Sequence, residues 1–109
     1  MARLSWSDKA IRDLEAIYDF IAADSPFYAK IQVERVVAVT ERISMYPESG
    51  RSIPELPHLP HQELICGSYR VVYRHETESE TVFIVSVVHA ARLMKDELLQ
   101  QPDGQDGPS

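Results

Sequence analysis

The dipeptide Gly67-Ser68 limits the fold of this chain most, because it separates two segments in which side-chain character alternates. A two-residue turn that begins with glycine joins antiparallel strands and fixes which residues lie opposite each other. We therefore expect segments 61–66 and 69–74 to pair as a β-hairpin. The expected pairs are Cys66 with Tyr69, Ile65 with Arg70, Leu64 with Val71, Glu63 with Val72, and His61 with Arg74.

Alternation in the second of these strands separates an apolar face from a basic face. Tyr69, Val71 and Tyr73 fall on one face, and Arg70, Val72 and Arg74 fall on the other. A polar turn over 76–80 then leads into the apolar segment 81–88, which predicts a third antiparallel strand. With a turn of that length the expected pairs are Tyr73 with Phe83, Arg70 with Ser86, Val71 with Val85, and Tyr69 with Val87.

The first half of the chain predicts two helices. Ser7 has the position of an N-cap, and the apolar stripe that follows it predicts a helix ending near Asp24. Ser25-Pro26 repeats the start signal, with proline at the first helical position, and the second helix is expected to run to about Met45. Helices joined by so short a connection form an antiparallel hairpin.

The predicted fold class is α+β. A first strand at residues 2–6 precedes the helical hairpin, which covers the apolar face of an antiparallel sheet whose last three strands form a meander. Residues 47–60 carry four prolines and are expected to be a long loop, and 91–99 predict a short C-terminal helix. We expect a single domain over residues 1–99 and a disordered acidic tail over 100–109.

Charge and composition restrict the classes of function. The net charge is −6, and residues 51–95, which hold the basic strand, carry five basic and five acidic side chains. A protein that grips nucleic acid unaided has a dense basic surface, so free-standing nucleic-acid binding is not expected. We also expect a cytoplasmic protein without membrane contact. The sequence has a single cysteine, no apolar run near the ~20 residues of a membrane span, and no signal-peptide pattern.

The basic face of the sheet is the candidate functional surface. It is expected to collect His61, Glu63, Arg70, Arg74 and Ser86 around Ile65, Val72 and Ile84. One interpretation is a solvated face with cross-strand ion pairs, in which Glu63 lies diagonal to both arginines. The other is an open polar surface presented to a large partner.

Such a face has the residue types for RNA cleavage through the 2′-hydroxyl. That reaction needs a base, a cation for the phosphate and an acid for the leaving oxygen. Glu55 or Glu63, Arg70 and His89 could take these roles in that order. No cofactor and no metal are expected, because His58 and His61 lack a matching ligand set and the chain has no phosphate-binding glycine loop.

Several phrases of the sequence, in order, resemble the RelE/ParE superfamily of bacterial toxins. The resemblance covers about Leu4 to Leu93. The phrases that carry it are Ser7–Leu14 with Ile17–Ala22, Tyr46–Arg51, Gly67–Tyr73 and Val87–Arg92.

This resemblance implies a growth-arresting toxin of a type II toxin–antitoxin system, held inactive by a cognate antitoxin whose C-terminal segment wraps around it. RelE-like members cut messenger RNA on the ribosome, and in such a member Arg70, His89 and Glu63 would be the catalytic residues. ParE-like members poison DNA gyrase without chemistry of their own. The ParE branch is favoured here, because His89-Ala90 lacks the His-Tyr pair of some RNA-cutting relatives. The expected target contacts are then Arg70, Arg74, Arg92 and His61.

Overall fold

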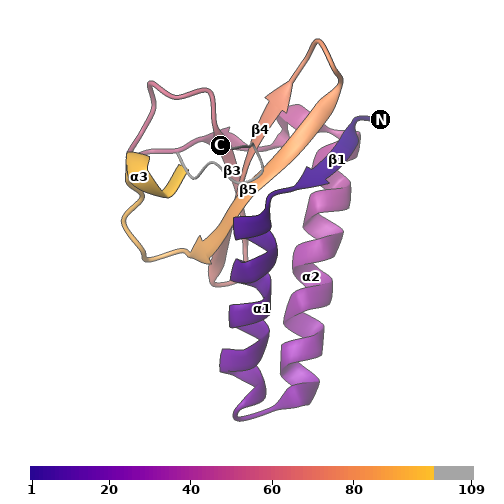
Figure 1. Cartoon of the computed structure of the whole chain (residues 1–109), viewed down its shortest axis with the longest axis vertical. Helices are drawn as coiled ribbons and strands as arrows, with labels where there is room; N and C mark the ends of the chain where they lie inside the picture. The colour runs from indigo at the N-terminus through magenta and orange to yellow at the C-terminus, as the bar shows by residue number, and fades with distance from the viewer. Residues whose placement is uncertain (100–109) are drawn as a thin grey trace.

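Strand β4 (Tyr69–Glu76) lies at the centre of a five-stranded sheet in the computed structural model, which describes residues 1–99 apart from the side chains of Glu97 and Leu98 (Figure 1). The strand order is β1-β5-β4-β3-β2. The other strands are β1 (Arg3–Trp6), β2 (Arg51–Ser52), β3 (Gln62–Cys66) and β5 (Thr81–His89). The predicted α+β class is confirmed, but the sheet is mixed, because β1 pairs parallel to β5.

Both helices begin where their capping residues predict. In α1 (Asp8–Ala22) the Ser7 side chain accepts a hydrogen bond from the Ala10 N–H, and in α2 (Pro26–Met45) Ser25 accepts one from Tyr28. Each bond satisfies a backbone donor that the first turn of a helix leaves unpaired. The helices lie side by side over one face of the sheet, called here the helix face, and the turn between them projects beyond the strands (Figure 1).

The β3–β4 hairpin has the predicted register. Gly67 adopts a φ of 61°. Cys66 pairs with Tyr69 and Glu63 with Val72, and the residues between them pair in the same register. A side chain with a β-carbon is strained at that φ, which is why glycine fits the first turn position.

The predicted register between β4 and β5 is wrong by two residues at the start of β4 and by one residue after the bulge. Tyr69 pairs with His89 rather than Val87, and Tyr73 pairs with Ile84 rather than Phe83. The connecting turn has four residues instead of five, which moves the pairing by one residue. A bulge then inserts Val85 as an unpaired residue between Ile84 and Ser86, which moves it by another.

This shift changes the face of several side chains. Ile84 and Ser86, expected on the basic face, lie on the helix face, where Ile84 joins the core and Ser86 is fully buried beneath α1. A register change of one residue turns a strand over, so Phe83 and Val85 lie on the opposite face.

Helix α1 supplies hydrogen bonds to the backbone at the bulge. The Ser7 hydroxyl donates to the Val85 carbonyl at 2.9 Å, and the Asp13 carboxylate accepts from the Val87 N–H at 3.0 Å. Asp13 also accepts from Ser86 Oγ and from Lys9 Nζ, an ion pair within one helix turn. The backbone groups at the bulge are therefore hydrogen-bonded to side chains of Ser7 and Asp13 rather than left unpaired.

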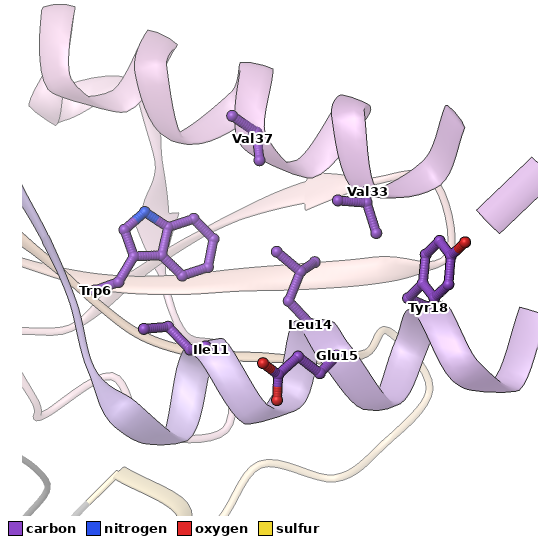
Figure 2. Close-up of a pocket in the computed structure, with 7 residues that line it drawn as sticks. All are labelled: Trp6, Ile11, Leu14, Glu15, Tyr18, Val33 and Val37. Carbon is purple, nitrogen blue, oxygen red and sulfur yellow. The ribbon is translucent and has the colours of Figure 1, made fainter. Parts of the chain in front are cut away.

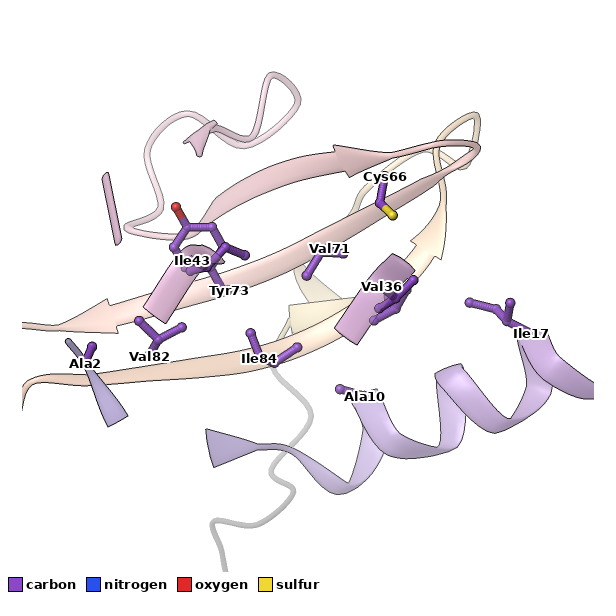
Figure 3. Packing of buried hydrophobic residues seen from close by; sticks show 11 residues of the cluster. Ala2, Ala10, Ile17, Val36, Ile43, Cys66, Val71, Tyr73, Val82 and Ile84 are labelled. Carbon is purple, nitrogen blue, oxygen red and sulfur yellow. The ribbon is translucent and has the colours of Figure 1, made fainter. Parts of the chain in front are cut away.

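Two apolar clusters form on the two faces of the sheet. The larger lies between the sheet and the helices and includes Val36 and Ile43 of α2 against Val71 and Tyr73 of β4 (Figure 3). The smaller covers the face that bears Arg70, Val72 and Arg74, called here the second face. It is made by Ile53, Leu56, Val72, Val88, Met94 and Leu99. The second face is thus partly covered, contrary to the expectation of an open surface.

The C-terminal helix is shorter than predicted. Helix α3 comprises Asp96–Leu99 instead of 91–99, and residues 93–95 before it have no regular structure. The expected tail over 100–109 lies outside the described residues. Among the residues described, no helix is both long and apolar enough to span a membrane.

Candidate functional site

Arg70 is the centre of a buried ion cluster on the second face. Its Nη2 donates to Glu55 Oε2 at 2.7 Å and its Nη1 to Glu55 Oε1 at 2.9 Å. Nη1 also donates to Glu63 Oε1 at 3.1 Å, and Nε donates to the Ala90 carbonyl. Each nitrogen of the guanidinium group is therefore hydrogen-bonded within the protein.

The acidic members of this cluster come from two different segments. Glu63 lies on β3 with a fully buried side chain, and its other oxygen accepts a hydrogen bond from Arg51 of β2. Glu55 lies in the loop between β2 and β3, and its carboxylate also accepts the Met94 N–H. The Arg70 guanidinium lowers the pKa of Glu55 to about 2, and Glu55 in turn raises the pKa of Arg70.

The cluster closes the second face at Arg70. Its side chain is 10% exposed, so the expectation of an arginine presented to solvent is wrong for this residue. The cause is the segment 53–60, which folds back over the sheet and carries Glu55 beside the apolar residues Ile53 and Leu56. Glu63 does lie next to Arg70 as predicted, but it is a carboxylate shared by two arginines.

His89 lies apart from this cluster. It is exposed at the end of β5 and stacks edge-on against Tyr69, a residue that packs on the helix-face core. Its Nδ1 accepts a hydrogen bond from the Ala91 N–H. The contacts of His89 and of Arg70 therefore lie on opposite faces of the sheet, and the expected catalytic set of Arg70, Glu63 and His89 is not assembled in one place.

A hollow of about 310 Å³ opens beside His89 at the end of α1. Ile17 and Phe20 of α1 line one side, and Val87, His89 and Arg92 line the other. Phe20 is 78% exposed, and Arg92 is also exposed. Arg92 is thus accessible to a partner, as a target-contacting residue must be.

Arg74 and His61 lie at the other end of the second face. The Arg74 guanidinium lies 4.7 Å from the centroid of the Phe83 ring, a cation–π contact. Burial and the nearby charge of Arg74 lower the pKa of His61. Unlike Arg70, Arg74 has no ion pair with any side chain of the described residues.

An apolar groove between α1 and α2 is a further candidate surface (Figure 2). The sequence predicted the helical hairpin as part of the docking surface of an antitoxin, but not the groove itself. It has a volume of about 370 Å³ and is lined by Trp6, Ile11, Leu14, Glu15, Tyr18, Val33 and Val37. Ile11 is 43% exposed and Val37 38%. An apolar helical stripe that is wider than the contact between two helices leaves apolar side chains exposed at its edge.

No group of three or more His, Cys, Asp or Glu side chains within residues 1–99 is arranged to hold a metal ion. Cys66 is the one cysteine of the chain, and burial raises the pKa of its thiol. The described residues thus provide two surfaces for contact, the groove and the hollow, and on the second face Arg74, which has no ion pair among them.

The arrangement of a helical hairpin on this mixed sheet is that of RelE/ParE toxin structures. A chain described as the chromosomal ParDE toxin–antitoxin system of P. aeruginosa aligns with a TM-score of 0.65 at 21% identity, covering 82% of this chain and 96% of that one. The toxin–antitoxin complex RelBE2 of Mycobacterium tuberculosis aligns with a TM-score of 0.56 at 24% identity, covering 81% and 96%. At these identities the likeness defines the fold class.

Sequence comparison defines the family. A family model described as the ParE toxin of the type II toxin–antitoxin system parDE matches residues 4–94. Toxin RelE2 of Caulobacter vibrioides is 34% identical over 93 residues, which span 85% of this chain and all of that protein. The chain therefore belongs to the ParE toxin family, within the RelE/ParE superfamily of type II toxin–antitoxin toxins.

Proposed function

We propose that this toxin arrests growth by binding DNA gyrase and performs no chemistry of its own. The observation that carries the proposal is the state of Arg70, whose guanidinium is bonded to Glu55 and Glu63. A phosphate anchor must offer free donors to the substrate, whereas these donors are already bonded to two carboxylates.

The position of His89 supports the same conclusion. General acid catalysis requires the acid within hydrogen-bond reach of the leaving group that the cation holds. His89 contacts Tyr69 and the backbone of Ala91, whereas the Arg70 guanidinium lies on the second face, bonded to Glu55 and Glu63. The tyrosine that follows the histidine in some RNA-cutting relatives is also absent, since residue 90 is alanine.

The competing function is ribosome-dependent cleavage of messenger RNA. The ParE family model favours gyrase, whereas the curated relative from Caulobacter vibrioides carries the name RelE2. In the competing function Glu55 would release Arg70, which would then act with His89. DNA gyrase and the ribosome are both cytoplasmic, so either function is consistent with the predicted cytoplasmic location.

Brief induction of the toxin in growing cells separates the two functions. A gyrase poison is expected to produce broken or relaxed plasmid DNA and an SOS response while bulk transcripts stay intact. Transcript cuts at codon-specific positions, with supercoiled plasmid unchanged, would refute the gyrase proposal. Purified gyrase with the full-length toxin gives the matching test in vitro, in which supercoiling is inhibited in the absence of ribosomes.

We further propose that a cognate antitoxin occupies the groove between α1 and α2 with an amphipathic helix. An apolar groove of this size at the surface of one chain suits a helix that inserts apolar side chains at helical spacing. Structures with this fold include toxin–antitoxin complexes, among them RelBE2 of Mycobacterium tuberculosis. A short reading frame next to this one should encode the antitoxin.

Substitution of Val37 tests the antitoxin site, because its side chain lines the groove and is 38% exposed. Val37→Glu is expected to weaken antitoxin binding at least tenfold by placing a charge in the apolar contact. Ala38→Glu is the matched control, since Ala38 is exposed on the same helix and does not line the groove. Equal affinities of the two variants in calorimetry would place the antitoxin elsewhere.

A further inference from the structure

Arg74 differs from the neighbouring arginines of the second face in its partners. Arg70 and Arg51 each form ion pairs with a buried or half-buried carboxylate. Arg74 is half-buried and rests on the Phe83 ring, and no carboxylate of the described residues lies within ion-pair distance of it. The nearest acidic position on that face of β4 is Glu76, whose carboxylate accepts a hydrogen bond from Ser79.

Strand pairing places His61 beside this arginine. Arg74 pairs with Phe83 of β5, and Gln62 of β3 pairs with Tyr73 of β4. Continuing the second register by one residue sets His61 opposite Arg74. The Nδ1 atom of His61 is buried and has no hydrogen-bond partner among the described residues.

Buried polar atoms without a hydrogen-bond partner are rare in folded proteins, and this one lies beside the Arg74 guanidinium, which has no ion pair among the described residues. The Phe83 ring restricts the guanidinium group of Arg74, which reduces the conformational entropy that a ligand must overcome. Such a pair offers a planar fork of N–H donors next to an imidazole nitrogen, a suitable arrangement for binding a small anion.

We infer that Arg74 and His61 form a seat for one carboxylate side chain of the toxin's protein target. In this seat the guanidinium donates two parallel hydrogen bonds to the carboxylate, and the His61 ring turns on binding so that its Nδ1, buried and unpaired in the free protein, donates a third. The inference rests on the proposed function in that the carboxylate belongs to the protein that the toxin arrests. Phe83 acts as a positioning residue, since it contacts the arginine rather than the ligand.

The surrounding charges favour a protein carboxylate over a nucleic-acid backbone. Binding to a phosphate backbone uses several cations in a row. On the second face Arg70 and Arg51 are neutralised by Glu55 and Glu63, which leaves Arg74 as the one arginine there without an ion pair in the described residues. A single guanidinium matches a single carboxylate, and the net charge of −6 opposes a polyanion.

The first experiment titrates ¹⁵N-labelled full-length toxin with N-acetyl-glutamate amide, which carries one side-chain carboxylate. We expect saturable shifts of the Arg74 Nε–Hε signal and of the His61 ring signals. Arg74→Gln should abolish the shifts of His61, whereas Arg42→Gln, an exposed arginine of α2, should leave them unchanged. Absence of a shift at both residues in the wild-type toxin would overturn the inference.

A second titration uses a single-stranded RNA oligonucleotide as the probe. The inferred seat predicts weak shifts that do not exceed those of the blocked glutamate. Tight binding of the RNA at Arg74, lost steeply with added salt, would overturn the carboxylate assignment in favour of nucleic acid.

The third measurement uses purified gyrase. Arg74→Gln should lower the affinity of the toxin for gyrase about tenfold, the usual effect of losing a charge-assisted hydrogen bond. Phe83→Leu should give a smaller loss, and Arg42→Gln none. An unchanged affinity of Arg74→Gln would overturn the seat as a target contact. If the wild-type toxin does not bind gyrase, the proposed function fails, and the glutamate titration still decides the seat.

Discussion

Removing Arg70 tests whether its ion cluster is structural. In Arg70→Gln the fully buried carboxylate of Glu63 keeps only Arg51, whose side chain is 62% exposed, and Glu55 loses two of its hydrogen bonds. Breaking a buried pair by deleting one partner costs ~3–5 kcal/mol, because the other charge stays buried without compensation. A domain of this size has a total stability of roughly 5–15 kcal/mol. The loss should therefore lower the melting temperature by at least ~10 °C.

Urea unfolding followed by the fluorescence of Trp6, the only tryptophan, measures this loss. Arg42→Gln is the matched control, because Arg42 is exposed, and its stability should stay within ~0.5 kcal/mol of wild type. The double variant Arg70→Met/Glu63→Leu should be more stable than Arg70→Gln, since it also removes the fully buried carboxylate of Glu63. An Arg70→Gln protein as stable as Arg42→Gln would refute the reasoning.

Three further outcomes follow from the same contacts. The pKa of Glu55 is about 2 in the folded protein, against an ordinary value of 4.5. Its contribution to the free energy of unfolding is therefore complete above pH 4.5 and is lost as the pH falls toward 2. Glu55→Gln should flatten that part of a pH–stability curve. Tyr73→Phe should cost ~1–3 kcal/mol in urea unfolding, since the buried hydroxyl donates to the Pro47 carbonyl and accepts from the Gly50 N–H. Gly50→Ala should destabilise the protein in the same assay and reduce soluble yield, because the added carbon would lie 2.5 Å from the Tyr73 hydroxyl.

Local signals in the sequence were sufficient for the helices and for one hairpin. Ser7 and Ser25-Pro26 each act through backbone groups a few residues away, so their effect can be read from neighbouring positions. The Gly67-Ser68 turn likewise fixes the register of β3 against β4 within one short loop.

The errors arose where the deciding partner is distant in sequence. The bulge at Val85 lies in the apolar run 82–88, where nearly every residue can be buried on either face, so alternation carries no register information. Its hydrogen bonds come from Ser7 and Asp13, more than seventy residues earlier. Nothing local could reveal them.

The candidate site was predicted in composition but not in arrangement. Arg70 and Glu63 are diagonal neighbours on adjacent strands, and the sequence placed them together. Glu55 comes from a proline-rich loop without periodicity, so its bond to Arg70 follows no pattern that a sequence displays. Had Glu55 been recognised as a partner of Arg70 rather than a candidate base, the arginine would have been expected to be buried.

The parallel pairing of β1 with β5 has a consequence for synthesis of the toxin. Arg3 to Trp6 pair with Thr81 to Ile84, so the first strand made on the ribosome has no partner until the last strand has emerged. Contacts between such distant positions form late and slowly. Until then the helical hairpin has an incomplete sheet to pack on, and the nascent chain exposes the apolar side chains meant for its core. The sheet of a newly made molecule therefore stays incomplete until residues 81–84 have been synthesised.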